Sequence, residues 1–210
     1  MRRFPALLVV TAGPLLLALA GLVHPHGLNP STAARWADLH VALLPVFPLV
    51  TAGFVVPLWG RPGWSLTGVA TVVAWTAGFG YACFYTGLDA VAGIAAGTAA
   101  RTAPPGTDLG PLVNPLFHAG DELGRLGAYL FLVAVAACSV AMFARYGART
   151  LPGAAVLLVA GSSFLDSHIF WPRGVATMLG FAIGFGWFGW FAHRQPVSAA
   201  AQGGERHPRT

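Results

Sequence analysis

The sequence contains no lysine, and charged residues make up only 9% of its 210 positions. A soluble domain carries about 25% charged residues, so this chain has too few to cover a surface in contact with water. Hydrophobic residues make up 56% of the chain, and its mean hydropathy is +0.66. The sequence therefore predicts an integral membrane protein that has the lipid bilayer as its surroundings.

Cysteine is also scarce. Cys83 and Cys138 each lie inside an apolar run, and the chain has neither a Cys-x-x-Cys motif nor a His-Glu-x-x-His motif. The first absence excludes a cysteine-based zinc site, so we expect the two cysteines to be small core residues. The second means that no motif indicates a named class of metal hydrolase. The twelve basic residues, all arginines, are scattered between apolar runs, and we therefore predict no nucleic-acid binding.

Long apolar runs are abundant, and each can form a helix of the roughly 20 residues that cross a bilayer. They predict a six-helix transmembrane bundle of the all-α class within a single domain, residues 1–193. The predicted spans are Pro5–Val23, Leu39–Trp59, Ser65–Tyr85, Pro115–Ala144, Leu151–Trp171 and Gly174–His193. The polar tail 194–210 is expected to be a disordered cytoplasmic segment. The first run has an alternative interpretation as a signal peptide, because Ala18-Leu19-Ala20 resembles a cleavage site.

Arginine is distributed unevenly between the predicted loops, which indicates an orientation. With the N-terminus inside, the inner segments carry eight arginines and the outer loops three, Arg125 being set aside. The inner set is Arg2, Arg3, Arg61, Arg145, Arg149, Arg194, Arg206 and Arg209, and the outer set is Arg35, Arg101 and Arg173. We therefore predict a multi-pass plasma-membrane protein with both termini cytoplasmic.

On this topology, nearly all acids and most histidines fall at the outer face. The stretch His118–Arg125 opens the fourth span, and its polar residues recur at helical spacing on one stripe. Intramembrane ionisable residues are costly unless they face a protein interior or a cavity. We therefore predict an extracytoplasmic polar pocket that binds a small molecule or a lipid. Its candidate residues are Asp38, His40, Asp89, His118, Asp121, Glu122, Arg125, Asp166 and His168.

Histidine and carboxylate together form the ligand set of many transition-metal sites. A divalent transition metal is one possible cofactor of the pocket, with hydrolase-like chemistry as the associated activity. The candidate ligands are His118, Asp121, Asp166 and His168, and Glu122 could act as a general base. The units Asp38-Leu-His40 and Asp166-Ser-His168 are not expected to chelate as pairs, because residues two apart point to opposite sides of a helix.

Three other interpretations remain open. Aligned ionisable groups also mark the pathways of transporters and proton-coupled permeases, although the inner halves of the spans lack a matching polar relay. The charges could instead form structural ion pairs, such as Arg35 with Asp38, Glu122 with Arg125 and Arg173 with Asp166. Finally, three Gly-x-x-x-Gly motifs, at Gly93, Gly120 and Gly180, present small faces for close helix packing. Such faces could serve a structural or assembly subunit that pairs with another copy or a membrane partner.

Several stretches carry a resemblance to known proteins. His24–Pro48, Gly87–Gly93, His118–Arg125 and Asp166–Pro172 together resemble small polytopic membrane proteins of actinobacterial type. The resemblance implies a location in the membrane and attaches no activity. Hydrolases of the alkaline ceramidase class also build a site from histidine, aspartate and serine on several helices, but seven spans are expected there and this chain has six.

Overall fold

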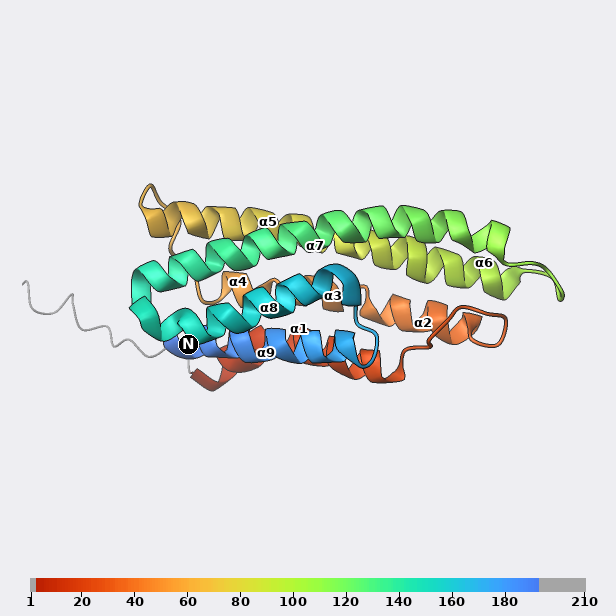
Figure 1. The fold of residues 1–210 in the computed structure, drawn as a ribbon, viewed down its shortest axis with the longest axis horizontal. Coiled ribbons are helices and arrows are strands. Elements are labelled where there is room, and N and C mark those ends of the chain that lie inside the picture. The colour runs from red at the N-terminus through yellow and green to blue at the C-terminus, as the bar shows by residue number, and fades with distance from the viewer. Residues whose placement is uncertain (1–2, 193–210) are drawn as a thin grey trace, which may run out of the picture.

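The structure is a computed structural model that describes residues 3–192. Within that range it is all-helical, and it contains no strand. Figure 1 shows the helices aligned along one long axis. In chain order they are α1 (Arg3–Val23), α2 (Ala33–Leu43), α3 (Val46–Leu49), α4 (Ala52–Val55), α5 (Leu66–Leu88), the π-helix η1 (Asp89–Ala95), α6 (Ala96–Thr102), α7 (Gly110–Tyr146), the 3₁₀ turn η2 (Gly147–Thr150), α8 (Leu151–Ser167) and α9 (Arg173–Ala192).

Among residues 3–192, five helical stretches are long and apolar enough to span a membrane. Six were expected, and the difference arises between the fourth and fifth predicted spans. These two lie in one continuous helical stretch, Gly110–Ser167. That stretch turns back at η2, where Gly147 adopts a φ of 71° that favours glycine. The predicted disordered tail 194–210 lies outside the described residues.

The second span begins earlier than predicted, at Ala33, and it is broken into α2, α3 and α4. Pro45 precedes α3, Pro48 lies within it and Pro57 follows α4. Each proline lacks the N–H that would continue a helical ladder. The three prolines therefore account for the breaks in this span.

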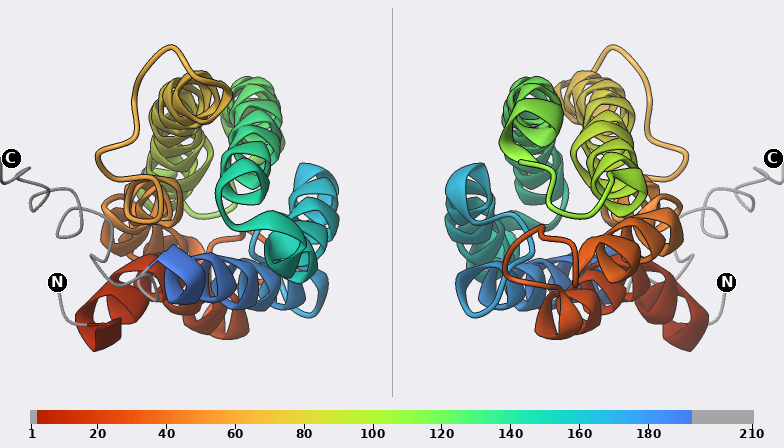
Figure 2. Two further views of the ribbon diagram at one scale, coloured as in Figure 1. Left: turned by 90° about the vertical axis from the view of Figure 1, so that its left-hand side faces the viewer. Right: turned by 90° about the vertical axis from the view of Figure 1, so that its right-hand side faces the viewer.

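The third predicted span extends to Thr102, well beyond its expected end at Tyr85, and the fourth begins at Gly110, shortly before the expected Pro115. The stretch Leu66–Thr102 is 37 residues long, and so is α7. At 1.5 Å per residue each measures about 55 Å, whereas the hydrocarbon core of a bilayer is about 30 Å thick. The two stretches pack along one another and form one side of the molecule (Figure 2), and α1 and α9 lie on the opposite side.

All three Gly-x-x-x-Gly motifs lie at helix contacts within the chain, as predicted. A Cβ added at Gly97 would lie 2.9 Å from Ala37 of α2, and one at Gly120 would lie 2.6 Å from the Ala92 side chain. A Cβ at Gly180 would lie 2.9 Å from Ala160 of α8. These small faces let η1, α6, α7 and α9 approach their neighbours closely. Association with a second copy or a membrane partner stays a prediction.

The core between the helices is built from aromatic rings. Phe131 of α7 lies at its centre, with ring centroids 4.6 Å from Phe181 and 5.3 Å from Phe54. Phe185 continues the cluster, 5.1 Å from Phe54. This apolar cluster forms the core of the bundle. The polar residues of the candidate site adjoin it.

Candidate functional site

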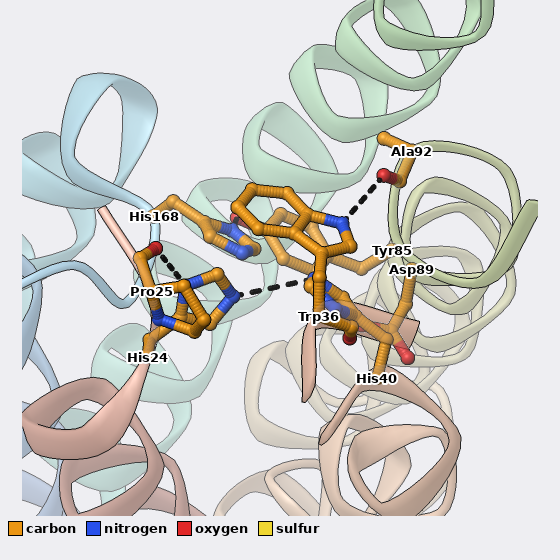
Figure 3. Close-up of polar contacts among 8 residues, drawn as sticks. All are labelled: His24, Pro25, Trp36, His40, Tyr85, Asp89, Ala92 and His168. Atoms are coloured by element: carbon orange, nitrogen blue, oxygen red, sulfur yellow. Dashed lines mark hydrogen bonds and ion pairs between the residues drawn. The ribbon is translucent and has the colours of Figure 1, made fainter. Parts of the chain in front are cut away.

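Three histidines from distant parts of the chain meet at one end of the apolar core. His24 follows α1, His40 lies on α2 and His168 follows α8 (Figure 3). His24 and His40 are buried, with exposed fractions of 5% and 3%. The histidines lie against aromatic rings, because His24 packs edge-on against Phe170 at 4.6 Å and against Trp36 at 4.9 Å. The cluster is therefore largely shielded from water.

The rings of His24 and His40 face each other through their Nε2 atoms, which lie 3.4 Å apart. Nδ1 of His24 is 2.8 Å from the carbonyl oxygen of Pro25, and Nδ1 of His40 is 2.7 Å from that of Trp36. A carbonyl oxygen only accepts, so each Nδ1 carries the proton and donates it. In the neutral rings, both Nε2 atoms then present a lone pair to each other. Such a pair is stabilised when a cation, either a proton or a metal ion, lies between the two nitrogens.

Asp89 lies beside this pair. Its side chain is fully buried, and its Oδ1 is 3.9 Å from Nε2 of His40. Neither carboxylate oxygen has a hydrogen-bond partner among the described residues. Asp89 is also the first residue of η1, and π-helical turns are frequent at functional sites because they re-aim side chains. A buried carboxylate of this kind is costly unless a cation is nearby.

The neighbouring backbone fixes the His40 ring. Trp36, one turn before His40 on α2, donates from Nε1 to the carbonyl oxygen of Ala92 in η1 at 3.1 Å. Gly93 lies directly against the His40 ring, where an added Cβ would lie 2.7 Å from the His40 Cβ and closer still to the ring atoms. Glycine is therefore required at this position for α2 and η1 to approach.

His168 takes part in a second pair. Its Nδ1 is 2.7 Å from the Tyr85 hydroxyl, a hydrogen bond that either atom can donate. Its ring also stacks on that of Tyr85, with centroids 5.5 Å apart. His168 ends α8 with a φ of 45°. A positive φ is uncommon for a residue other than glycine, and such conformations concentrate at functional sites.

A cavity of about 600 Å³ opens beside the two pairs. Its aromatic wall consists of Trp36, Phe117, Phe164 and Phe170, and its polar lining consists of His40, Tyr85, Asp121, Arg125, Asp166 and His168. These residues come from α2, α5, α7, α8 and the segment after α8. Cavities of this size with apolar walls and a few convergent polar groups are typical of small-molecule sites.

The electrostatics of the cluster follow from its burial. The pKa of His24 is lowered to about 4, chiefly by burial; the hydrogen bond to Pro25 opposes the shift, and the nearby charges of His40, His26 and Arg35 add to it. His24 is therefore neutral near pH 7 and retains its Nε2 lone pair.

Six of the nine predicted site residues lie in the cluster or at the cavity wall. His40, Asp89 and His168 lie in the cluster, and Asp121, Arg125 and Asp166 lie at the cavity wall. His118 is exposed on α7 and does not line the cavity. Asp38, Glu122 and Asp166 form exposed ion pairs with Arg101, Arg125 and Arg173, at 3.4, 3.2 and 3.6 Å. Of the three ion pairs predicted from the sequence, Glu122–Arg125 and Arg173–Asp166 are present. The predicted pair of Arg35 with Asp38 is wrong, because Asp38 pairs with Arg101 and Arg35 instead donates to the carbonyl oxygen of Val23.

Sequence reasoning did not place His24, Trp36 and Tyr85 in the site. His24 stands in a turn-rich segment, where a solvated histidine is the usual expectation. The tryptophan and tyrosine matched the expectation for interfacial or lipid-facing aromatics. One local signal could have identified Tyr85, because Tyr81, Tyr85 and Asp89 recur every four residues and share one helix face.

The candidate metal ligands from the sequence do not converge. Across residues 3–192, no group of three or more histidine, cysteine, aspartate or glutamate side chains has the spacing of a complete metal site. His24 and His40 form the closest pair, with Asp89 somewhat farther away.

Comparison with known proteins identifies no relative: no family model, no curated protein and no solved structure matches the chain. The function is therefore inferred from the geometry of the chain itself.

Proposed function

We propose that this integral membrane protein binds an amphiphilic, lipid-like molecule in the cavity beside the histidine cluster. In this proposal six segments cross the plasma membrane, both termini are cytoplasmic and the cavity opens on the extracytoplasmic side. The observation that carries the proposal is the cavity of about 600 Å³, which combines an aromatic wall with charged and hydrogen-bonding groups.

The arrangement of the loops supports the topology. α7 and α8 run side by side in opposite directions from η2 (Figure 1), so the long stretch Gly110–Ser167 provides two crossings. Arg145 and Arg149 lie at this turn. The loop 56–65 before α5, which contains Arg61, lies at the same end of the bundle (Figure 1). The loops 24–32, 103–109 and 168–172 lie toward the other end. Arginine-rich short loops favour the cytoplasmic side.

The chemistry of the lining supports an amphiphilic ligand. Phe117, Phe164 and Phe170 offer apolar surface to a chain or ring, while Asp121 and Arg125 offer charge to a headgroup. His168 and Tyr85 add hydrogen-bonding groups on the same wall. A histidine in this place can also transfer a proton. If the protein is an enzyme, we therefore expect hydrolase-like chemistry on the bound molecule.

A binding pocket is favoured over a transport pathway. Phe54, Phe131 and Phe185 pack against one another in the bundle core, and all three are fully buried. A transported ion or proton needs polar groups on both sides of its site. The polar cluster instead ends against this aromatic layer.

The test is retention of a ligand by the purified protein. Leu165 lines the cavity, so Leu165→Trp fills part of its volume. Val159→Trp on the same helix is the matched control, because Val159 is 72% exposed on the outer surface of the bundle. Native mass spectrometry of protein extracted from membranes is expected to show one retained amphiphile in the wild type and in Val159→Trp, and none in Leu165→Trp. Equal retention in all three, or no retention in any, would contradict the proposal.

A further inference from the structure

We propose that Nε2 of His24, Nε2 of His40 and the Asp89 carboxylate bind one divalent first-row transition-metal ion. This site differs from the ligand set that the sequence suggested, since it uses a histidine from the segment after α1 and an aspartate from the π-helix.

The spacing of the two nitrogens supports a metal. Zinc binds imidazole nitrogen at about 2.0–2.1 Å in tetrahedral geometry, which separates two such ligands by about 3.3–3.4 Å. The observed distance between the two Nε2 atoms is 3.4 Å. The pair therefore already has the separation that a tetrahedral ion requires.

The hydrogen bonds at the far side of each ring also support a metal. Metal-bound histidines generally donate their second ring N–H to a carbonyl or carboxylate, which fixes the tautomer and the ring orientation. His24 and His40 both do so, to Pro25 and Trp36. Both rings are thereby held with Nε2 as the free ligand atom (Figure 3).

Asp89 supplies the third ligand and the negative charge. Its carboxylate is fully buried, and neither oxygen has a hydrogen-bond partner among the described residues. Its Oδ1 is 3.9 Å from Nε2 of His40, which exceeds the ligand–ligand distance of a tetrahedral site by about 0.6 Å. The carboxylate would have to move closer to the two nitrogens to complete a three-ligand site, since no three such side chains among the described residues have the spacing of a metal site. Two imidazoles and a carboxylate suit zinc, iron or manganese.

The metal proposal stands apart from the proposed function. His24 and Asp89 do not line the cavity, and only His40 belongs to both. A cavity-filling change such as Leu165→Trp is therefore expected to leave metal binding intact. Loss of amphiphile binding and loss of metal binding can then be observed separately.

The experiment measures zinc binding to the full-length protein in detergent. The protein is stripped with a chelator and dialysed, and ZnCl₂ is then titrated against a chromophoric competitor. The test variants are His24→Ala, His40→Ala and Asp89→Asn. His26→Ala and His118→Ala are the matched controls, because both histidines are exposed and lie outside the cluster.

The wild type and both controls are expected to bind one equivalent of zinc. Each test variant is expected to bind more than about 10-fold more weakly, since loss of an outer-shell partner alone already costs 10-fold to 100-fold. Wild-type protein that binds no zinc, or His24→Ala and His40→Ala that bind it as tightly as the wild type, would overturn the proposal.

A second measurement needs no variant and so does not depend on the fold of a mutant. Co²⁺ added to the stripped wild-type protein is expected to give intense visible absorption of a low-symmetry, near-tetrahedral site, and one equivalent of Zn²⁺ is expected to abolish it. Weak absorption typical of hydrated, octahedral Co²⁺ would contradict the proposed ligand set.

Discussion

Asp89 could serve as a metal ligand or as the structural partner of His40. The two roles predict opposite changes in the stability of the Asp89→Asn variant. We expect Asp89→Asn to raise the free energy of unfolding of the metal-free protein by about 1 to 3 kcal/mol, because burying an unpartnered carboxylate costs more than burying an amide. Chemical denaturation of the stripped protein measures the change.

A decrease in the free energy of unfolding of Asp89→Asn would instead identify a structural ion pair. Removing one member of a buried pair typically destabilises a protein by about 3 to 5 kcal/mol, so a loss of that size would mean that Asp89 serves mainly to hold His40, 3.9 Å away. Asp121→Asn is the control, since Asp121 is exposed on α7 and its change is expected to be small.

Asp38 illustrates the exposed acids. Its carboxylate is 72% exposed and pairs with Arg101, and such surface pairs contribute about 0–1 kcal/mol. Asp38→Asn is therefore expected to change stability by less than about 1 kcal/mol and to leave zinc affinity unaltered. A loss of zinc binding in this variant, in the titration described above, would place Asp38 in the site and contradict the geometry.

Residue spacing predicted part of the site. The rule that residues two apart point to opposite sides of a helix separates Asp38, which faces water, from His40, which faces the cluster. The rule does not apply to Asp166 and His168, because α8 ends at Ser167 and both residues line the cavity. The sequence could not predict that His24 joins His40, because no helical period relates a loop residue to a helix packed against it through tertiary contacts.

At the scale of elements, the contact between η1 and α2 depends on Gly93. Gly93→Ala places a Cβ against the His40 ring. Overpacking of this kind costs about 1 to 3 kcal/mol, and the displaced ring is expected to bind zinc more weakly. Thermal unfolding and zinc titration of this variant check both effects.

Gly87→Ala, in α5 of the same helical stretch, is the matched control. Its Cβ would lie 3.4 Å from Leu123, an ordinary contact, and alanine favours a helix by up to about 1 kcal/mol over glycine. It is expected to be neutral or stabilising. If Gly93→Ala behaved in the same way, the close contact between η1 and His40 would not be important for stability.

The elements themselves were largely predictable. Apolar runs located the spans because burial in lipid requires an uninterrupted apolar helix, and the breaks of the second one coincide with Pro45, Pro48 and Pro57. The outer ends were not predictable from hydropathy. Residues 89–102 remain helical because they pack on α2 and α7. Such packing does not require an apolar run long enough to cross a membrane, so the hydropathy of the sequence does not indicate it.

For the whole molecule, the arrangement of arginines predicts which end faces the cytoplasm. In a protein without native cysteines, Asp108→Cys is expected to react with a membrane-impermeant maleimide on intact cells, because residue 108 lies in the loop between α6 and α7. Ala148→Cys, in η2 at the other end, is expected to react only after permeabilisation. The reverse pattern would invert the topology and place the cavity on the cytoplasmic side.

The one-sided distribution of acids and histidines was evident from the sequence, since hydropathy and charge determine which loops share a side. The convergence of the loops was not. Residues of η1, α7 and α8 line the cavity together with residues of α2. How these helices are positioned along one another depends on side-chain packing, which hydropathy does not reveal.

The measurement that tests the account most directly is a density map of the wild-type protein in a lipid nanodisc. We expect non-protein density in the cavity, with an apolar part along Phe117 and Phe164 and a polar end beside Asp121 and Arg125. A map in which side chains close the cavity, or in which the cavity opens only to solvent with no bound molecule, would contradict the proposed function.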